Sequence, residues 1–130
     1  MKISELKTFI NEGKLDDKLV ELYGEKALDA QKERYTAILD NALHAFSDEE
    51  ARIYSAPGRT EIGGNHTDHQ LGKVLAASLN LDVVACVIPT DDNIVTYASK
   101  GYNVKPVDVS DITIHEEEKN STEALIRGVA

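Results

Sequence analysis

Apolar residues recur every three or four positions through the first third of the chain, up to Phe46. This spacing places apolar side chains on one face of a helix. It predicts three amphipathic helices, over residues 3–10, 15–23 and 28–46. Gly24 follows the second segment and supplies a stop, because glycine adopts the left-handed backbone that ends many helices. The amino-terminal part of the chain is therefore expected to be helical.

After residue 50 the pattern changes to that of β-strands. Residues 51–56 alternate and predict a short strand that ends at Pro57. Residues 81–89 are rich in β-branched side chains and almost wholly apolar, which predicts a buried central strand. After a turn at residues 90–93, residues 94–99 alternate well enough to pair back on that strand as a hairpin.

The last third of the chain is less regular. Residues 104–109 predict a weaker strand at a sheet edge, because Pro106 cannot donate a ladder hydrogen bond. The following residues to Asn120 are acidic, and the run 116–118 predicts a solvated face or loop. Asn120, Ser121 or Thr122 can cap a final helix with inward-facing residues Ala124, Leu125 and Val129. The predicted fold class is α+β: helices first, then a mostly antiparallel sheet, then one helix.

The composition narrows the classes of partner. A formal net charge of −9 and a pI near 4.8 disfavour binding to nucleic acid or to an anionic membrane, because both are polyanions. No apolar run approaches the length that spans a bilayer. Cys86 is the one cysteine, which excludes an intrachain disulfide, and its apolar neighbours predict a buried thiol. These features are typical of a cytoplasmic protein.

Polar chemistry is concentrated in residues 56–72, which read APGRTEIGGNHTDHQLG. Four glycines and one proline let the backbone turn sharply and approach a ligand closely. Between them stand one arginine, two carboxamides, two imidazoles and two carboxylates. A structural turn has no use for so many directional hydrogen-bonding groups, so this stretch predicts a site for a polar small molecule.

The same stretch resembles the galactokinase signature of the GHMP sugar-kinase superfamily, Gly-Arg-x-Asn-x-Ile-Gly-Glu-His-x-Asp-Tyr. Arg59, Gly64, His66 and Asp68 fall on the pattern without a gap. The runs 72–79 and 124–129 are also similar to galactokinases, so the resemblance covers about the last eighty residues well and the first fifty loosely. Among the residues that depart from the signature, Glu61 replaces Asn, Asn65 replaces Glu and His69 replaces Tyr.

The resemblance implies a role for each matching position. Arg59 would stabilise charge on the transferred phosphate or orient the catalytic base. The positions that would contact galactose are Asn65, His66, Thr67 and Asp68. Ser99 resembles the position that contacts the nucleotide. Asn65 both donates and accepts hydrogen bonds where the family has an acceptor, so a changed sugar preference is expected.

The residues leave structural alternatives open. Arg59 can form a structural salt bridge with Glu61 or Asp68 instead of binding a ligand. Asp68 can cap a turn within its own loop. His66, Asp68 and His69 can ligate a transition metal, although no further motif supplies the remaining ligand that such a site needs.

The superfamily's phosphate-binding motif, Gly-Leu-Ser-Ser-Ser, does not occur in these 130 residues. The chain therefore resembles one partial domain over residues 1–130, the amino-terminal, galactose-recognition portion of a galactokinase. The implied parent reaction is ATP-dependent phosphorylation of the anomeric hydroxyl of galactose with Mg²⁺, and the 130 residues alone are expected to be inactive. The alternative is a non-catalytic sugar-binding or regulatory module derived from a galactokinase.

Overall fold

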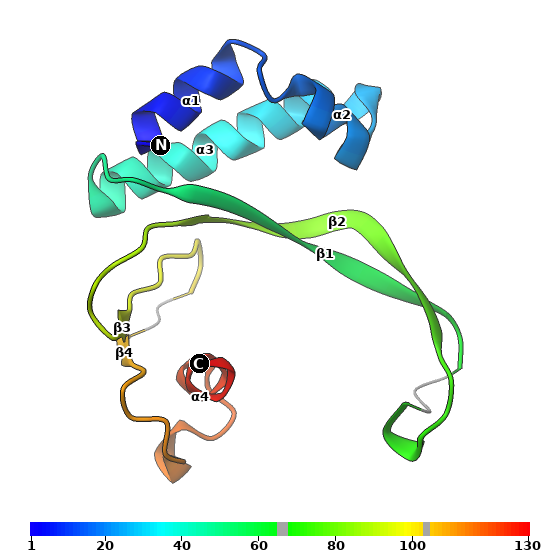
Figure 1. Ribbon diagram of the computed structural model, residues 1–130, viewed down its shortest axis with the longest axis vertical. Coiled ribbons are helices and arrows are strands. Elements are labelled where there is room, and N and C mark those ends of the chain that lie inside the picture. The colour runs from blue at the N-terminus through cyan, green and yellow to red at the C-terminus, as the bar shows by residue number, and fades with distance from the viewer. Residues whose placement is uncertain (65–67, 103–104) are drawn as a thin grey trace. The chain divides into compact units, whose positions relative to one another are not determined.

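A computed structural model describes residues 1–64, 68–102 and 105–130; the side chain of Asp68 also lies outside the described part. The chain divides into two compact units, Met1–Ile88 and Pro89–Ala130 (Figure 1). Each unit is described by itself below. The assignment of residues 1–130 to one partial domain stays a prediction.

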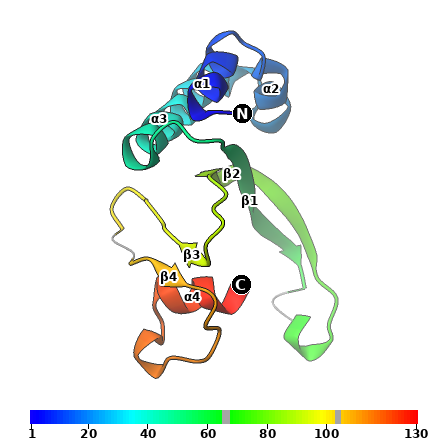
Figure 2. The ribbon, with the colours of Figure 1, turned by 60° about the vertical axis from the view of Figure 1, so that its left-hand side comes forward.

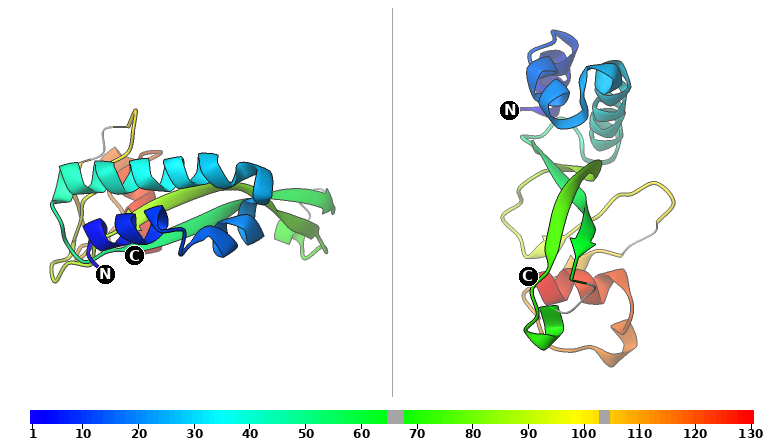
Figure 3. Two further views of the ribbon diagram at one scale, coloured as in Figure 1. Left: turned by 90° about the horizontal axis from the view of Figure 1, so that it is seen from above. Right: turned by 90° about the vertical axis from the view of Figure 1, so that its right-hand side faces the viewer.

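Three helices form the amino-terminal part of the first unit, as the apolar periodicity predicts. They are α1 (Ile3–Asn11), α2 (Asp16–Tyr23) and α3 (Leu28–Phe46), with a short 3₁₀ turn, η1 (Glu25–Ala27), before the last. Gly24 ends α2 with a φ of 84°, a backbone conformation that favours glycine. Seen from above, α1 and α2 lie along the longer α3 (Figure 3).

A long antiparallel ribbon completes the first unit. It consists of β1 (Arg52–Gly63) and β2 (Leu75–Val87), paired regularly from Arg52 opposite Val87 to Pro57 opposite Asp82. The predicted strand end at Pro57 is wrong, because β1 continues to Gly63. Proline is tolerated there because, among the described residues, β1 has a neighbour on one side only.

The core of the first unit lies between the helices and one face of the ribbon (Figure 2). Ile3, Ile10, Leu19 and Leu39 are all at most 1% exposed. Three ribbon residues, Ile53, Val84 and Cys86, are partly buried against this core, as is Ile88 directly after β2. Burial raises the pKa of the Cys86 thiol, although the predicted full burial is not reached.

The opposite face of the ribbon is apolar and exposed. Leu81 is 72% exposed, Val83 70% and Tyr54 52%. The prediction that residues 81–89 form a buried central strand is therefore wrong for this chain. In the described part of the chain β2 has β1 as its one strand neighbour, and the helices cover one face of the ribbon.

The second unit holds a short sheet and a helix. β3 (Ile94–Val95) pairs with β4 (Val107–Asp108), so the predicted hairpin between residues 81–89 and 94–99 is wrong. The predicted strand over residues 104–109 is present as the shorter β4. A 3₁₀ turn, η3 (Glu116–Glu118), precedes α4 (Thr122–Val129).

The final helix is confirmed, with Ser121 as its cap: the Ala124 amide donates to Ser121 Oγ at 3.1 Å. Its predicted inward face is wrong, because Leu125 is 67% exposed and Val129 80%. Arg127, on the other side of α4, donates to Glu118 and to two backbone carbonyls, and these bonds set the rotation of the helix. The observed fold class is α+β, as predicted.

Candidate functional site

The galactokinase-like stretch lies at the far end of the β1–β2 ribbon and in the connection between the two strands. Gly64 begins that connection with a φ of 112°. A Cβ on Gly64 would lie 2.7 Å from both the Lys73 carbonyl oxygen and Val74 Cα, which is closer than real Cβ atoms approach. Glycine is therefore required here, because the two ends of the connection touch. The described part of the connection includes the 3₁₀ turn η2 (Asp68–Gln70).

Arg59 lies on β1, opposite Ser78, and is exposed. The ribbon changes register between Pro57 and Arg59. Within the described part of the chain, Arg59 has no hydrogen bond or ion pair, so the salt bridge to Glu61 is not formed. The alternative bridge to Asp68 involves a side chain outside the described part. The guanidinium is therefore not neutralised by Glu61.

The predicted galactose contacts Asn65, His66 and Thr67 lie outside the described residues. Asp68 begins η2, with its side chain outside the described part. Their roles as sugar contacts stay predictions, and so does the alternative of a turn-capping Asp68. The metal alternative depends on the same residues; elsewhere, the described residues contain no cluster of three or more His, Cys, Asp or Glu that could hold a metal ion.

Ser99, the predicted nucleotide contact, belongs to the second unit. It forms an isolated β-bridge with Tyr102, whose amide donates to the Ser99 carbonyl at 3.2 Å. Its role as a nucleotide contact stays a prediction.

The sequence reasoning missed a polar network centred on Asp82, whose side chain is 2% exposed. Arg34 Nη1 donates to Asp82 Oδ1 at 2.6 Å, and Arg34 Nη2 donates to the Asp82 carbonyl at 2.9 Å. Tyr23 Oη and Ser55 Oγ each donate to Asp82 Oδ2 at 2.5 Å. Tyr35 Oη lies 2.8 Å from Tyr23 Oη and extends the network into the core. The carboxylate thus joins α2, α3 and both strands.

The electrostatics of this network favour an ionised Asp82. Burial opposes ionisation, but hydrogen bonds from Ser55, Tyr23 and Arg34 outweigh it and lower the pKa of the carboxyl. The pKa of Arg34 is raised, chiefly by its hydrogen bond to Asp82. Burial and the bond to Tyr23 raise the pKa of Tyr35, which keeps its hydroxyl neutral. One signal in the sequence pointed to this network: Asp82 is the one charged residue in the otherwise apolar run 81–89.

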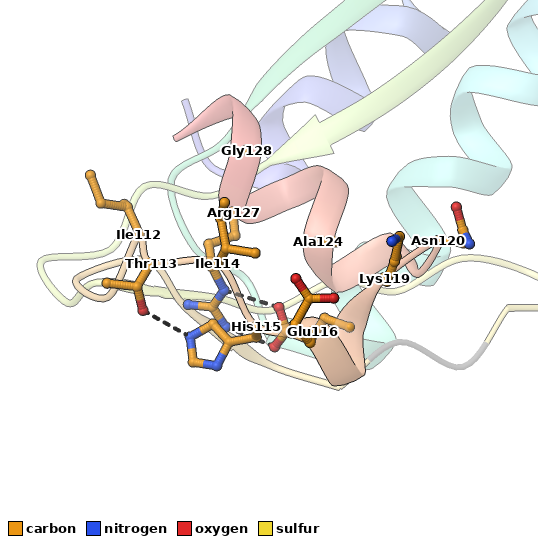
Figure 4. Close-up of a pocket in the computed structure, with 11 residues that line it drawn as sticks. Ile112, Thr113, Ile114, His115, Glu116, Lys119, Asn120, Ala124, Arg127 and Gly128 are labelled. Atoms are coloured by element: carbon orange, nitrogen blue, oxygen red, sulfur yellow. Dashed lines mark hydrogen bonds and ion pairs between the residues drawn. The ribbon is translucent and has the colours of Figure 1, made fainter.

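A cavity of about 300 Å³ lies in the second unit, between α4 and the segment before it (Figure 4). Two side chains of its lining have polar partners: Arg127 donates to Glu118 at 2.9 Å, and His115 Nε2 lies 3.0 Å from Asp111 Oδ2. Hydrogen bonds from Thr113 lower the pKa of Asp111 to about 2. The acidic segment is therefore organised by Arg127 rather than simply solvated. Neither Arg59 nor Ser99, the predicted phosphate and nucleotide contacts, lines this cavity.

The comparison with known proteins that found a match concerns mainly the first unit. Residues 43–89 match the family model for the galactokinase galactose-binding signature. The match runs from the end of α3 through β1, the connection and β2. No solved structure matches the chain. The described part of the chain contains no helix with the length and apolarity needed to traverse a membrane.

The galactokinase resemblance is confirmed by this match. The chain carries a galactokinase-related segment. This segment consists mainly of the β1–β2 ribbon and the connection between its strands, whose two ends meet at Gly64.

Proposed function

We propose that this chain is the galactose-recognition portion of a galactokinase-like sugar kinase that phosphorylates the anomeric hydroxyl of galactose with ATP. The observation that carries the proposal is the match of residues 43–89 to the galactokinase galactose-binding signature. The ribbon supports it physically. Two paired strands hold the ends of a short polar connection together, which lowers the entropy that the loop loses when a sugar binds.

Each proposed role follows from the chemistry of the side chain. The Asp68 carboxylate would accept hydrogen bonds from sugar hydroxyls, with Asn65, His66 and Thr67 as further contacts in the same connection. Arg59 would stabilise negative charge on the phosphoryl group during transfer. Its exposure and its lack of a described carboxylate partner leave the guanidinium available to an anionic ligand.

ATP and Mg²⁺ are proposed as cofactors of the parent enzyme, and Ser99 as a nucleotide contact. The described residues contain no cluster that fits a metal ion, so we assign no catalytic step of this chain to Mg²⁺. The Gly-Leu-Ser-Ser-Ser motif is also missing from the sequence. We therefore propose that these 130 residues recognise sugar and do not transfer a phosphoryl group by themselves. A cytoplasmic location is proposed because the sequence has a single cysteine and no apolar run that approaches the length of a bilayer span.

A second candidate function is a non-catalytic sugar-binding or regulatory module. The observation that favours it is Asn65, which replaces the family's Glu. An amide lacks the charge of the carboxylate and weakens a hydrogen bond to a sugar hydroxyl. The exchange is therefore compatible with a protein that has kept the loop but changed its ligand or lost catalysis.

The experiment measures galactose-dependent ADP release in a coupled assay, for the 130-residue chain and for a longer kinase chain that contains it. Arg59→Ala is compared with Arg52→Ala, which removes the same charge from an exposed position on the same strand. We expect no turnover from the short chain, turnover from the longer one, and a large loss with Arg59→Ala alone. Calorimetric binding of galactose without turnover by the longer chain would favour the module. Absence of both binding and turnover would overturn the proposal.

A further inference from the structure

The apolar pattern of the β1–β2 ribbon does not define how its strands are paired. Every position from Val83 to Ile88 is apolar, so both faces of β2 carry apolar side chains. Sliding a strand by one residue exchanges its two faces, and this is costly only where the faces differ. Hydrophobic burial alone therefore gives weak discrimination between registers in this part of the ribbon.

The Asp82 network favours the observed pairing of β1 with β2 over pairings shifted by one residue. Its donors come from α2 (Tyr23), α3 (Arg34) and β1 (Ser55). Ser55 pairs with Val84, so its bond to Asp82 is a diagonal contact on the same face of the ribbon. A shift of one residue would turn Asp82 to the exposed face and leave these donors without their acceptor.

Asp82 also lies directly before the part of the ribbon that carries Arg59 and leads to the galactokinase-like connection. It pairs with Pro57, the last regular pair before the register changes. The next pair joins Arg59 to Ser78, so two steps along β1 match four along β2. At the change, a Cβ on Gly58 would lie 3.1 Å from the Leu81 carbonyl oxygen, so the two backbones are already in close contact.

We propose that Asp82 is a positioning residue for the signature: its carboxylate fixes the register of the ribbon and thereby the place at which Arg59 and the following connection are presented. The link to sugar recognition rests on the proposed function. Asp82 itself is buried among Tyr23, Arg34 and Ser55, and acts through them rather than on a ligand.

The test uses Cys86, the one cysteine of the chain, as a reporter of register. Cys86 pairs with Ile53, and directly paired residues of antiparallel strands lie at a distance that a disulfide can bridge. Ile53→Cys is compared with Arg52→Cys and Tyr54→Cys, which report a slip of one residue in either direction. Each dilute protein is oxidised, and the intramolecular disulfide is quantified by intact mass.

With Asp82 present we expect Ile53→Cys to cross-link about tenfold better than the two neighbouring variants, and we expect Asp82→Ala to remove that preference. Leu39→Ala is the control: it removes a core side chain of the same unit, 0% exposed, leaves every hydrogen-bonding group of the network in place, and should keep the preference. Ser55→Ala removes only the hydrogen bond between the two strands, and we expect it also to remove the preference. This variant provides the test if Asp82→Ala does not fold.

An unchanged preference in folded Asp82→Ala or, where that variant does not fold, in Ser55→Ala overturns the proposal. So does an equal loss in Leu39→Ala, or the absence of any preference when Asp82 is present. The cross-linking needs no sugar, so its result is separate from that of the ADP-release assay. A register that depends on Asp82 in a protein without sugar binding or turnover would overturn the proposed function and leave the positioning of the ribbon standing.

Discussion

The two buried tyrosines of the Asp82 network are expected to contribute unequally to stability, although their hydroxyls contact each other. Tyr23 donates to Asp82 Oδ2 at 2.5 Å, so the bond between the tyrosines has Tyr35 as its donor and Tyr23 as its acceptor. Tyr23 thus takes part in two hydrogen bonds and Tyr35 in one. Tyrosine-to-phenylalanine variants test this order while keeping the edge-to-face ring contact, at 6.3 Å between centroids.

The magnitudes follow from what each hydroxyl does. Tyr23→Phe removes a bond to a charged carboxylate and leaves the Tyr35 hydroxyl buried without its acceptor, which should lower the free energy of unfolding by about 2–4 kcal/mol. Tyr35→Phe removes one neutral hydrogen bond and leaves the Tyr23–Asp82 bond in place, at a cost of about 1 kcal/mol. The double variant should cost no more than Tyr23→Phe, because Tyr35 then has no bond left to lose.

Urea unfolding followed by far-UV circular dichroism measures these differences without relying on tyrosine fluorescence. With an m-value of about 2 kcal/mol/M, Tyr23→Phe should shift the midpoint by about 1–2 M, clearly more than Tyr35→Phe. Equal costs for the two single variants would refute the assigned direction of the bond. A double variant whose cost is the sum of the single costs would show that the hydroxyls are not coupled.

Further predictions concern pH, a helix cap and the sugar loop. Folding lowers the pKa of Asp82, so the carboxylate stabilises the fold above its unfolded pKa of about 3.9, and this stabilisation is lost as pH falls through the lower folded pKa. Urea unfolding across this pH range should therefore show a steeper loss of stability towards acid in the parent protein than in Asp82→Asn. Ser121→Ala should destabilise α4 by about 1 kcal/mol and speed hydrogen exchange of the Ala124 amide, and unchanged exchange would argue against the cap. In a longer, active kinase chain, Asp68→Ala should raise the galactose KM about tenfold to a hundredfold, whereas an unchanged KM in the folded variant would exclude a sugar contact. Asn65→Glu should alter the ratio of kcat/KM between galactose and its epimers, and identical profiles would show that this position does not read the sugar.

Features that depend on near neighbours in the sequence could be predicted. The three amino-terminal helices follow from apolar residues a few positions apart, and Gly24 ends α2 because of its own backbone freedom. Ser121 caps α4 through an amide three residues away. The galactokinase-like stretch was recognisable for the same reason: its glycines and polar residues are contiguous, and the family match falls on them.

Pairing and burial were decided by the tertiary structure. The apolar run 81–89 is compatible with a buried strand, but its partners are chosen by segments distant in sequence, and the chain pairs it with β1 alone among the described residues. Likewise the alternation of residues 94–99 does not say which strand they meet, and β4 is the one that pairs there.

The Asp82 network shows the same limit at the level of single side chains. Tyr23 and Asp82 are 59 positions apart, and Arg34 and Asp82 are 48 apart, so no local pattern connects them. In the sequence Asp82 is an isolated charge in an apolar strand, which breaks the pattern without indicating why. Only the packing of α2 and α3 on the ribbon brings donors to that carboxylate and makes its burial stable, because a buried charge is tolerated only where such donors surround it.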